Sequence, residues 1–183
     1  FLNKLCDTGT PVILIIFGGR PMSISRIAQR CSAGLYAWYP GEEGGRAVVD
    51  LLSGRQNPSA KLTVALPDKP NEYELTISKR VLKCNTPYPF GYGLSYSRFT
   101  YLSLDIPEAV SLQEECFKIT FQIKNDSDCD GTEITQIYMT EPECAEKRLI
   151  GFCRNDITKH DIIRCELTVF MDALAKYGED GEL

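Results

Sequence analysis

Hydrophobic positions in the first third of the chain switch between continuous apolar runs and helical spacing. The run Val12 to Phe17 is apolar throughout and mostly β-branched, which is typical of a strand covered on both faces in a parallel sheet. Further apolar runs predict strands over 35–39 and 62–66, and helical spacing predicts helices over 2–6, 22–31 and 46–52. This order predicts an α/β segment with a mostly parallel βαβαβ sheet. Because no capping residue precedes Phe1, we expect the chain to begin inside a helix.

The second half of the chain has a different pattern, in which short strand-like runs alternate between apolar and polar residues. Strict alternation is clear over 117–123 and 163–169, as half-buried antiparallel strands require. Strands are predicted over 99–106, 117–124, 134–140, 149–152 and 162–170. We therefore expect an all-β immunoglobulin-like sandwich. Such a sandwich usually has about seven strands, so we also expect its closing strands to lie outside this chain.

A segment rich in Pro, Asn, Tyr and Gly separates the two halves. It shows no sustained hydrophobic period, which indicates a linker or an irregular surface segment. The predicted organisation is therefore an α/β part over residues 1–67, a linker over 68–96 and a β-sandwich over 97–183, with both folded parts incomplete at the chain ends.

Composition excludes several classes of protein. The 183 residues are 43% hydrophobic and 25% charged, as in globular domains. The longest apolar run is far shorter than the roughly 20 residues that cross a bilayer, so no membrane-spanning helix is expected. The formal net charge is −5, with Lys and Arg scattered along the chain. This distribution gives no electrostatic basis for binding nucleic acid or an anionic membrane.

The chain contains eight cysteines, but no C-x-x-C pair. A zinc site is therefore not expected. Several cysteines lie inside apolar patterns, where a free thiol behaves as a small hydrophobic group, so reduced thiols and a cytoplasmic location are favoured over secretion. One glycosylation sequon, Asn125-Asp126-Ser127, keeps a secreted origin open.

Three short features of the sequence resemble functional sites only in part. The sequence Asp126-x-Asp128-x-Asp130-Gly131 imitates the start of a calcium loop, but its twelfth position is Ile137 instead of Glu. We expect a polar hairpin turn there and no metal site. The sequence Gly91-Tyr92-Gly93 has Tyr96 where a dinucleotide fingerprint needs its third glycine, and no cofactor is expected. His160 is interpreted as an exposed loop residue.

Two other loops carry more information, because both leave the carboxyl ends of predicted parallel strands. That edge is where open α/β sheets bind ligands. The first loop supplies Arg20, whose guanidinium suits hydroxyls or carboxylates, and the second supplies Trp38, Tyr39 and Glu43, a combination that suits a sugar ring. The alternative is structural: Trp38 and Tyr39 would pack at a domain interface, while Arg20 and Glu43 would pair with each other or with a neighbouring chain.

Four stretches together resemble the C-terminal part of glycoside hydrolase family 3, the β-glucosidase and β-xylosidase family. They are residues 9–21 (GTPVILIIFGGRP), 37–45 (AWYPGEEGG), 57–62 (NPSAKL) and 88–96 (YPFGYGLSY). Each stretch is modest alone, whereas their order and spacing are specific. The resemblance implies that residues 1–67 are the later part of an α/β sandwich domain and that residues 97–183 are a fibronectin type III-like domain.

The resemblance also implies an activity whose catalytic residues lie outside this chain. The resemblance implies a retaining glycosidase. In such a family member an aspartate on a (β/α)₈ barrel is the nucleophile, and a glutamate of the α/β sandwich is the acid/base. The barrel is missing here, and the acid/base glutamate belongs to a segment upstream of the position matched by Phe1. The resemblance implies that Glu42 and Glu43 lie in a loop near a domain contact and do not take the place of the acid/base glutamate.

The function predicted from the resemblance is that of a segment of a β-glycosidase, most naturally a β-glucosidase. It would hydrolyse terminal, non-reducing β-linked sugars, with this chain shaping the cleft and stabilising the fold. No catalytic residue, metal or cofactor is assigned to the chain, and the 183 residues alone are predicted to be inactive. The alternative is a non-catalytic interaction module or a degenerate homologue, because a shared fold does not by itself transmit activity.

Overall fold

The computed structural model describes residues 1–68, 86–111, 113–141 and 144–175. This part of the chain is mostly sheet with few helices. It divides into a first unit, residues 1–56 and 61–93, and a second unit, residues 57–60 and 94–183. Most of the predicted linker, residues 69–85, lies outside the described residues. No helix among the described residues is long and apolar enough to cross a membrane.

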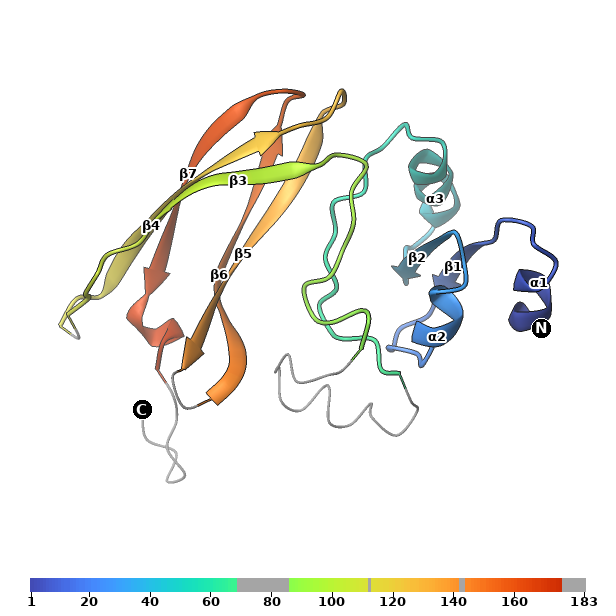
Figure 1. Ribbon diagram of the computed structural model, residues 1–183, viewed down its shortest axis with the longest axis horizontal. Coiled ribbons are helices and arrows are strands. Elements are labelled where there is room, and N and C mark those ends of the chain that lie inside the picture. Colours follow the sequence, from blue (N-terminus) through green and yellow to red (C-terminus); the bar gives the residue numbers. More distant parts are fainter. Residues whose placement is uncertain (69–85, 112, 142–143, 176–183) are drawn as a thin grey trace. The chain divides into compact units, whose positions relative to one another are not determined.

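The first unit is built around two parallel strands joined through a helix (Figure 1). Its elements are α1 (Leu2–Cys6), β1 (Ile13–Phe17), α2 (Ser25–Ala28), β2 (Ala33–Trp38) and α3 (Gly44–Leu52). The strands pair in parallel from Ile13 opposite Ala33 to Phe17 opposite Trp38. Both strands therefore end at the same edge of the sheet.

The predicted strand over 62–66 is wrong. This stretch bonds to residues 88–92 without forming a strand: the Leu62 amide donates to the Tyr92 carbonyl at 2.7 Å, and the Leu66 amide donates to the Tyr88 carbonyl at 2.9 Å. Ala65 and Leu66 are buried, which explains the apolar pattern. The run is apolar because it is buried, and its backbone hydrogen-bond partners come from the irregular segment at 88–92.

The helix predicted over 22–31 is much shorter than expected, since α2 has four residues. Ser25, its first residue, is fully buried and directs its hydroxyl out of the helix, donating to the Leu66 and Pro67 carbonyls at 3.3 and 3.1 Å.

The expectation that β1 is covered on both faces also differs from the structure. Only Ile16 of β1 is buried, so neither face of this strand is fully covered in the described part of the chain.

The second unit contains five strands in its described part, as many as the sequence predicts. They are β3 (Phe99–Asp105), β4 (Cys116–Asn125), β5 (Gly131–Glu141), β6 (Cys144–Ile157) and β7 (Ile162–Phe170). Strands β3, β4 and β7 form one antiparallel sheet, in the order β3-β4-β7, and β5 pairs with β6 in another (Figure 1). Strand β6 is longer than its four predicted residues because pairing with β5 continues through its polar end, where Ile157 lies opposite Gly131.

One hydrophobic core lies within the second unit and draws on both sheets. Ile119, Phe121 and Ile123 of β4 are at most 3% exposed, and they cluster with Val169 of β7 and Ile157 of β6. The alternation that predicted β4 and β7 therefore marks the faces that bury this core. A short 3₁₀ helix, Met171–Ala173, follows β7.

Tyr101 links the two sheets and makes the stability of the second unit sensitive to alkaline pH. Its hydroxyl, on β3, donates to Glu133 and to Thr135 on β5, each at 3.1 Å. Burial raises the pKa of Tyr101 to about 12. The neutral phenol is thus favoured by folding, so its contribution is complete below the ordinary pKa near 10 and is lost as pH rises towards about 12.

We expect the melting temperature of the chain to fall between about pH 10 and pH 12, and Tyr101→Phe to flatten that fall. The effect should be smaller than for a fully buried tyrosine, because 49% of Tyr101 is exposed to solvent. Thermal unfolding followed by circular dichroism measures it. Tyr39→Phe, at an exposed ring, is the control; an identical pH dependence for both variants would contradict the prediction.

Candidate functional site: the carboxyl edge of the first sheet

The two loops singled out in the sequence begin side by side, because β1 and β2 are parallel neighbours. The register slips between Ile16 and Phe17, so that Phe17 lies opposite Trp38 instead of Ala37. Beyond the strands, the Gly18 amide donates to the Trp38 carbonyl at 3.0 Å. The bulge and this hydrogen bond fix the start of the loop that carries Arg20 against the end of β2.

Trp38 ends β2 in a backbone conformation that a tryptophan rarely adopts, with φ at 52°. Its ring packs against Tyr36, with ring centroids 4.6 Å apart and planes tilted by 49°. The Tyr36 hydroxyl in turn donates to the Arg20 carbonyl at 2.5 Å. A side chain on one strand therefore holds the loop that leaves the other. Sequence reasoning did not single out Tyr36, although its position two residues before Trp38 could have suggested a shared face.

The ring of Tyr39 lies over the backbone of Gly19. A Cβ atom built on Gly19 would stand 2.1 Å from Cε2 of Tyr39, far inside a van der Waals contact. The rest of the tyrosine is open to solvent, with 82% of the residue exposed. A side chain at position 19 would therefore displace the far end of the exposed Tyr39 ring.

Gly19→Ala should displace Tyr39 and, through the joined loops, alter the surroundings of Trp38. Trp38 is the single tryptophan in the chain, so its fluorescence reports on this edge without interference. We expect a shifted emission maximum in Gly19→Ala. Gly34→Ala is the matched control on β2, since no atom lies within 4 Å of a Cβ there. Equal spectra for wild type and Gly19→Ala would contradict the packing of Tyr39 on Gly19.

Glu43 lies in the turn that leads from β2 into α3, where it occupies the N-cap position without a side-chain capping hydrogen bond. Its carboxylate is exposed, as is Arg20 on the other loop. Among the described residues no ion pair joins Arg20 to Glu43. The edge therefore presents the Arg20 guanidinium, the neighbouring carboxylates of Glu42 and Glu43, the exposed Tyr39 ring and the partly exposed Trp38 ring. Such a set can bind a polyhydroxylated ligand through hydrogen bonds and ring stacking.

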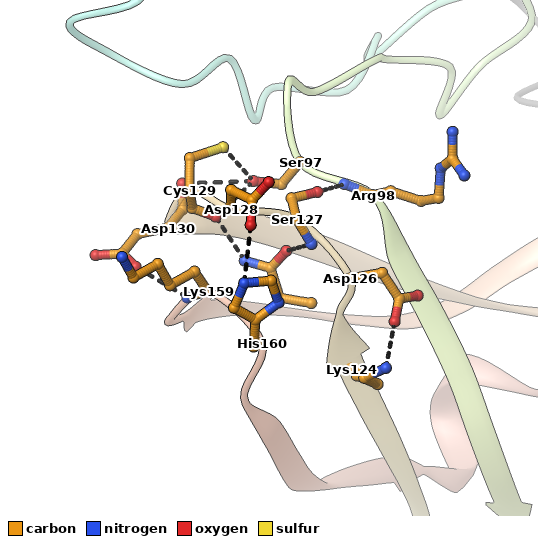
Figure 2. A network of polar contacts seen from close by, with 11 residues as sticks. Ser97, Arg98, Lys124, Asp126, Ser127, Asp128, Cys129, Asp130, Lys159 and His160 are labelled. Atoms are coloured by element: carbon orange, nitrogen blue, oxygen red, sulfur yellow. Dashed lines mark hydrogen bonds and ion pairs between the residues drawn. The ribbon is translucent and has the colours of Figure 1, made fainter.

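The acidic segment between β4 and β5 forms a separate polar network in the second unit. Figure 2 shows that its three aspartates turn to different partners. Asp126 pairs with Lys124 at 2.7 Å, and Asp128 contacts the Nε2 atom of His160 at 3.0 Å. Asp130 accepts a hydrogen bond from the Lys159 amide at 2.9 Å. In the described part of the chain no group of three or more potential ligands converges on a cation position.

The expected hairpin turn at 126–130 is wrong, because its flanking strands belong to different sheets. Asn125, fully buried at the end of β4, organises the crossing: its amide donates to the Cys129 and Ile157 carbonyls at 2.9 and 3.1 Å, and its side-chain oxygen accepts from the Ser127 amide at 3.0 Å. Figure 2 shows the turn that results. Because Asn125 is buried, the sequon is not open to glycosylation in the folded chain.

Comparison with known proteins links the sequence to glycosidases. The family described as "Glycosyl hydrolase family 3 C-terminal domain" matches residues 1–96. A periplasmic β-glucosidase of Salmonella typhimurium is 29% identical over 169 residues, covering 80% of this chain and 22% of the relative. A xylan 1,4-β-xylosidase of Xylanibacter ruminicola is 31% identical over 166 residues, covering 86% of this chain and 19% of the relative.

Solved structures give the same result for the fold. A β-glucosidase from Listeria innocua, crystallised in complex with glucose, matches 99% of this chain and 28% of its own with a TM-score of 0.80 and 29% identity. A β-glucosidase 3B from Thermotoga neapolitana matches 95% of this chain and 28% of its own, with a TM-score of 0.76 and 26% identity. The chain thus spans about a quarter or less of the curated relatives named above.

Proposed function

Because the chain belongs to glycosyl hydrolase family 3, we propose that it is a segment of a retaining β-glycosidase that hydrolyses terminal, non-reducing β-linked sugars. A β-glucosidase is favoured over a β-xylosidase, since relatives of both kinds match but both solved structures named above are β-glucosidases. The observation that carries this proposal is the family match over residues 1–96, which includes the whole carboxyl edge of the first sheet.

In this proposal the carboxyl edge forms part of the wall of the substrate cleft. Arg20, Trp38, Tyr39 and Glu43 either bind the sugar or contact the barrel domain. Ring faces suit the apolar face of a pyranose, and the guanidinium suits its hydroxyls. The exposed Tyr39 ring and the fixed position of the Arg20 loop support this role.

The reaction itself requires carboxylates from elsewhere in the protein. Retention of configuration needs two carboxyl groups about 5–5.5 Å apart on opposite sides of the glycosidic bond. Glu42 and Glu43 are exposed neighbours in one turn, so they do not form an opposed pair. We assign the nucleophile to an aspartate of a (β/α)₈ barrel and the acid/base to a glutamate upstream of this segment.

The division into domains is also part of the proposal. Residues 1–67 would be the later part of the α/β sandwich domain, and residues 97–183 a fibronectin type III-like domain. The parallel pairing of β1 with β2 supports the first assignment. The core that two antiparallel sheets share in the second unit supports the second. A cytoplasmic location is proposed because the six cysteines with described side chains carry free thiols.

The proposal is tested by assaying the longest protein whose reading frame contains these 183 residues. A barrel with an aspartate nucleophile in that frame, together with hydrolysis of an aryl β-glucoside and retention of the β-anomer, is the expected result. Aryl β-xyloside in a parallel assay measures the sugar preference. A reading frame without a barrel, or a full protein with no turnover of either substrate, would favour the non-catalytic interaction module instead.

A further inference from the structure

A short stretch from the first half of the chain, residues 57–60, belongs to the second unit. It forms neither a helix nor a strand, and no backbone-to-backbone hydrogen bond involves it in the described part of the chain. Residues 52–56, just before it, are exposed, whereas Asn57 is partly buried. Side chains must therefore hold this stretch in place, and the hydrogen bonds that do so are those of Asn57.

The Asn57 side-chain amide uses its whole hydrogen-bonding capacity. Its Nδ2 atom donates to the Ser97 hydroxyl at 2.8 Å and to the Asp130 carbonyl at 2.9 Å. Its Oδ1 atom accepts from the Ser95 hydroxyl at 2.8 Å and from the Tyr96 amide at 2.9 Å. A primary amide has two N–H donors and an oxygen with two lone pairs, so every position is occupied.

The residues that receive the Asn57 amide are themselves held closely together. Ser97 is 7% exposed, and its hydroxyl donates to the Cys129 carbonyl at 3.2 Å, beside the acidic turn (Figure 2). A Cβ atom built on Gly131 would stand 2.4 Å from the Ser97 hydroxyl oxygen, so this close approach depends on the absence of a side chain at position 131. One amide thus joins residues 95–97 to the turn at 129–130.

We propose that residues 57–60 are a strap on the second unit, fastened by the Asn57 side chain. The second unit is then a discontinuous domain, whose first part precedes residues 61–93 and whose main part begins at residue 94. The proposed fibronectin type III-like domain, which starts at residue 97, gains an upstream segment. Opening of the strap removes the Asn57 oxygen from the Tyr96 amide, so the exchange of that amide proton with solvent measures the opening locally.

The test is hydrogen exchange of the full 183-residue chain, followed by mass spectrometry of its peptides, with the variant Asn57→Asp. Aspartate has the size of asparagine and keeps an acceptor for the Tyr96 amide, but its carboxylate has no donor for Ser97 or Asp130. Losing two hydrogen bonds should open the strap more often and speed exchange in peptides that contain residues 95–98 on the order of tenfold. Protection in β4 and β7 should stay unchanged, because these strands pair with each other without the strap.

Gln56→Glu is the matched control, since it adds the same charge one residue earlier, at an exposed position outside the strap. The proposal is overturned if residues 95–98 exchange at the same rate in Asn57→Asp and in Gln56→Glu. It is also overturned if exchange rises as much in β4 and β7, because Asn57 would then act on the stability of the whole unit and not on a strap. Both outcomes leave the proposed glycosidase function unaffected.

Discussion

Trp38→Ala is expected to lower kcat/KM of the longer enzyme on the order of a hundredfold, since an error of about 1 Å at a catalytic group can cost that much. The Trp38 ring supports Tyr36, whose hydroxyl holds the Arg20 carbonyl, and the Trp38 backbone holds Gly18. Removing the ring therefore withdraws support from Tyr36, and through it from the Arg20 loop, while the backbone hydrogen bond to Gly18 remains. Steady-state kinetics with an aryl β-glucoside measure the effect.

Trp38→Phe is the matched variant, because it keeps an aromatic ring against Tyr36 and should retain most of the activity. Arg20→Ala separates ligand contact from loop support, since the Tyr36 hydroxyl bonds the Arg20 backbone and not its side chain. Full activity in both Trp38→Ala and Arg20→Ala, with the fold intact, would assign these residues a purely structural role.

Asn125→Ala should be the most destabilising polar substitution in the second unit, lowering the free energy of unfolding by about 2–4 kcal/mol. Asn125 is fully buried, and its side chain satisfies the Cys129 and Ile157 carbonyls and the Ser127 amide. Alanine removes all three hydrogen bonds, although the Ser97 hydroxyl still donates to the Cys129 carbonyl at 3.2 Å, and it also removes buried volume. Urea unfolding followed by circular dichroism measures the loss.

Ser103→Ala provides the control on the same sheet, because Ser103 is exposed and its hydroxyl makes a 3.4 Å hydrogen bond to Gln122. Its effect should stay within about 0.5 kcal/mol. A similarly small change in Asn125→Ala would show that the turn between the two sheets does not depend on the buried asparagine.

The local spacing of apolar residues correctly predicted the strands whose structure depends mainly on their own residues. The strict alternation over 117–123 and 163–169 identified β4 and β7, because in both strands one face meets the core and the other meets solvent. The parallel pairing of β1 with β2 followed from apolar runs separated by a helical pattern. Their shared edge brings the Arg20 loop to β2, where the Tyr36 hydroxyl bonds the Arg20 carbonyl. In each case the period of the sequence matches the period of the backbone.

The predictions from the sequence are wrong where residues far away in the chain determine the local structure. Residues 62–66 carry an apolar run, but their amides and carbonyls bond to 88–92, which no local pattern indicates. The acidic turn at 126–130 has the composition of a hairpin, yet Asn125 connects it to Ile157 on the other sheet. The contact of Tyr39 with Gly19 likewise joins two loops. A single sequence records which residues are apolar or turn-forming, but not their long-range partners.

We propose that this chain shapes a glycosidase cleft while the opposed catalytic carboxylates come from the rest of the protein. An oxocarbenium-like transition state loses most of its electrostatic stabilisation without them. The direct measurement is incubation of the purified 183-residue chain with an aryl β-glucoside and an aryl β-xyloside, beside the longer enzyme. We predict turnover by the longer enzyme and none by the chain alone. Turnover by the isolated chain that survives repurification and disappears in Glu42→Gln or Glu43→Gln would contradict this account.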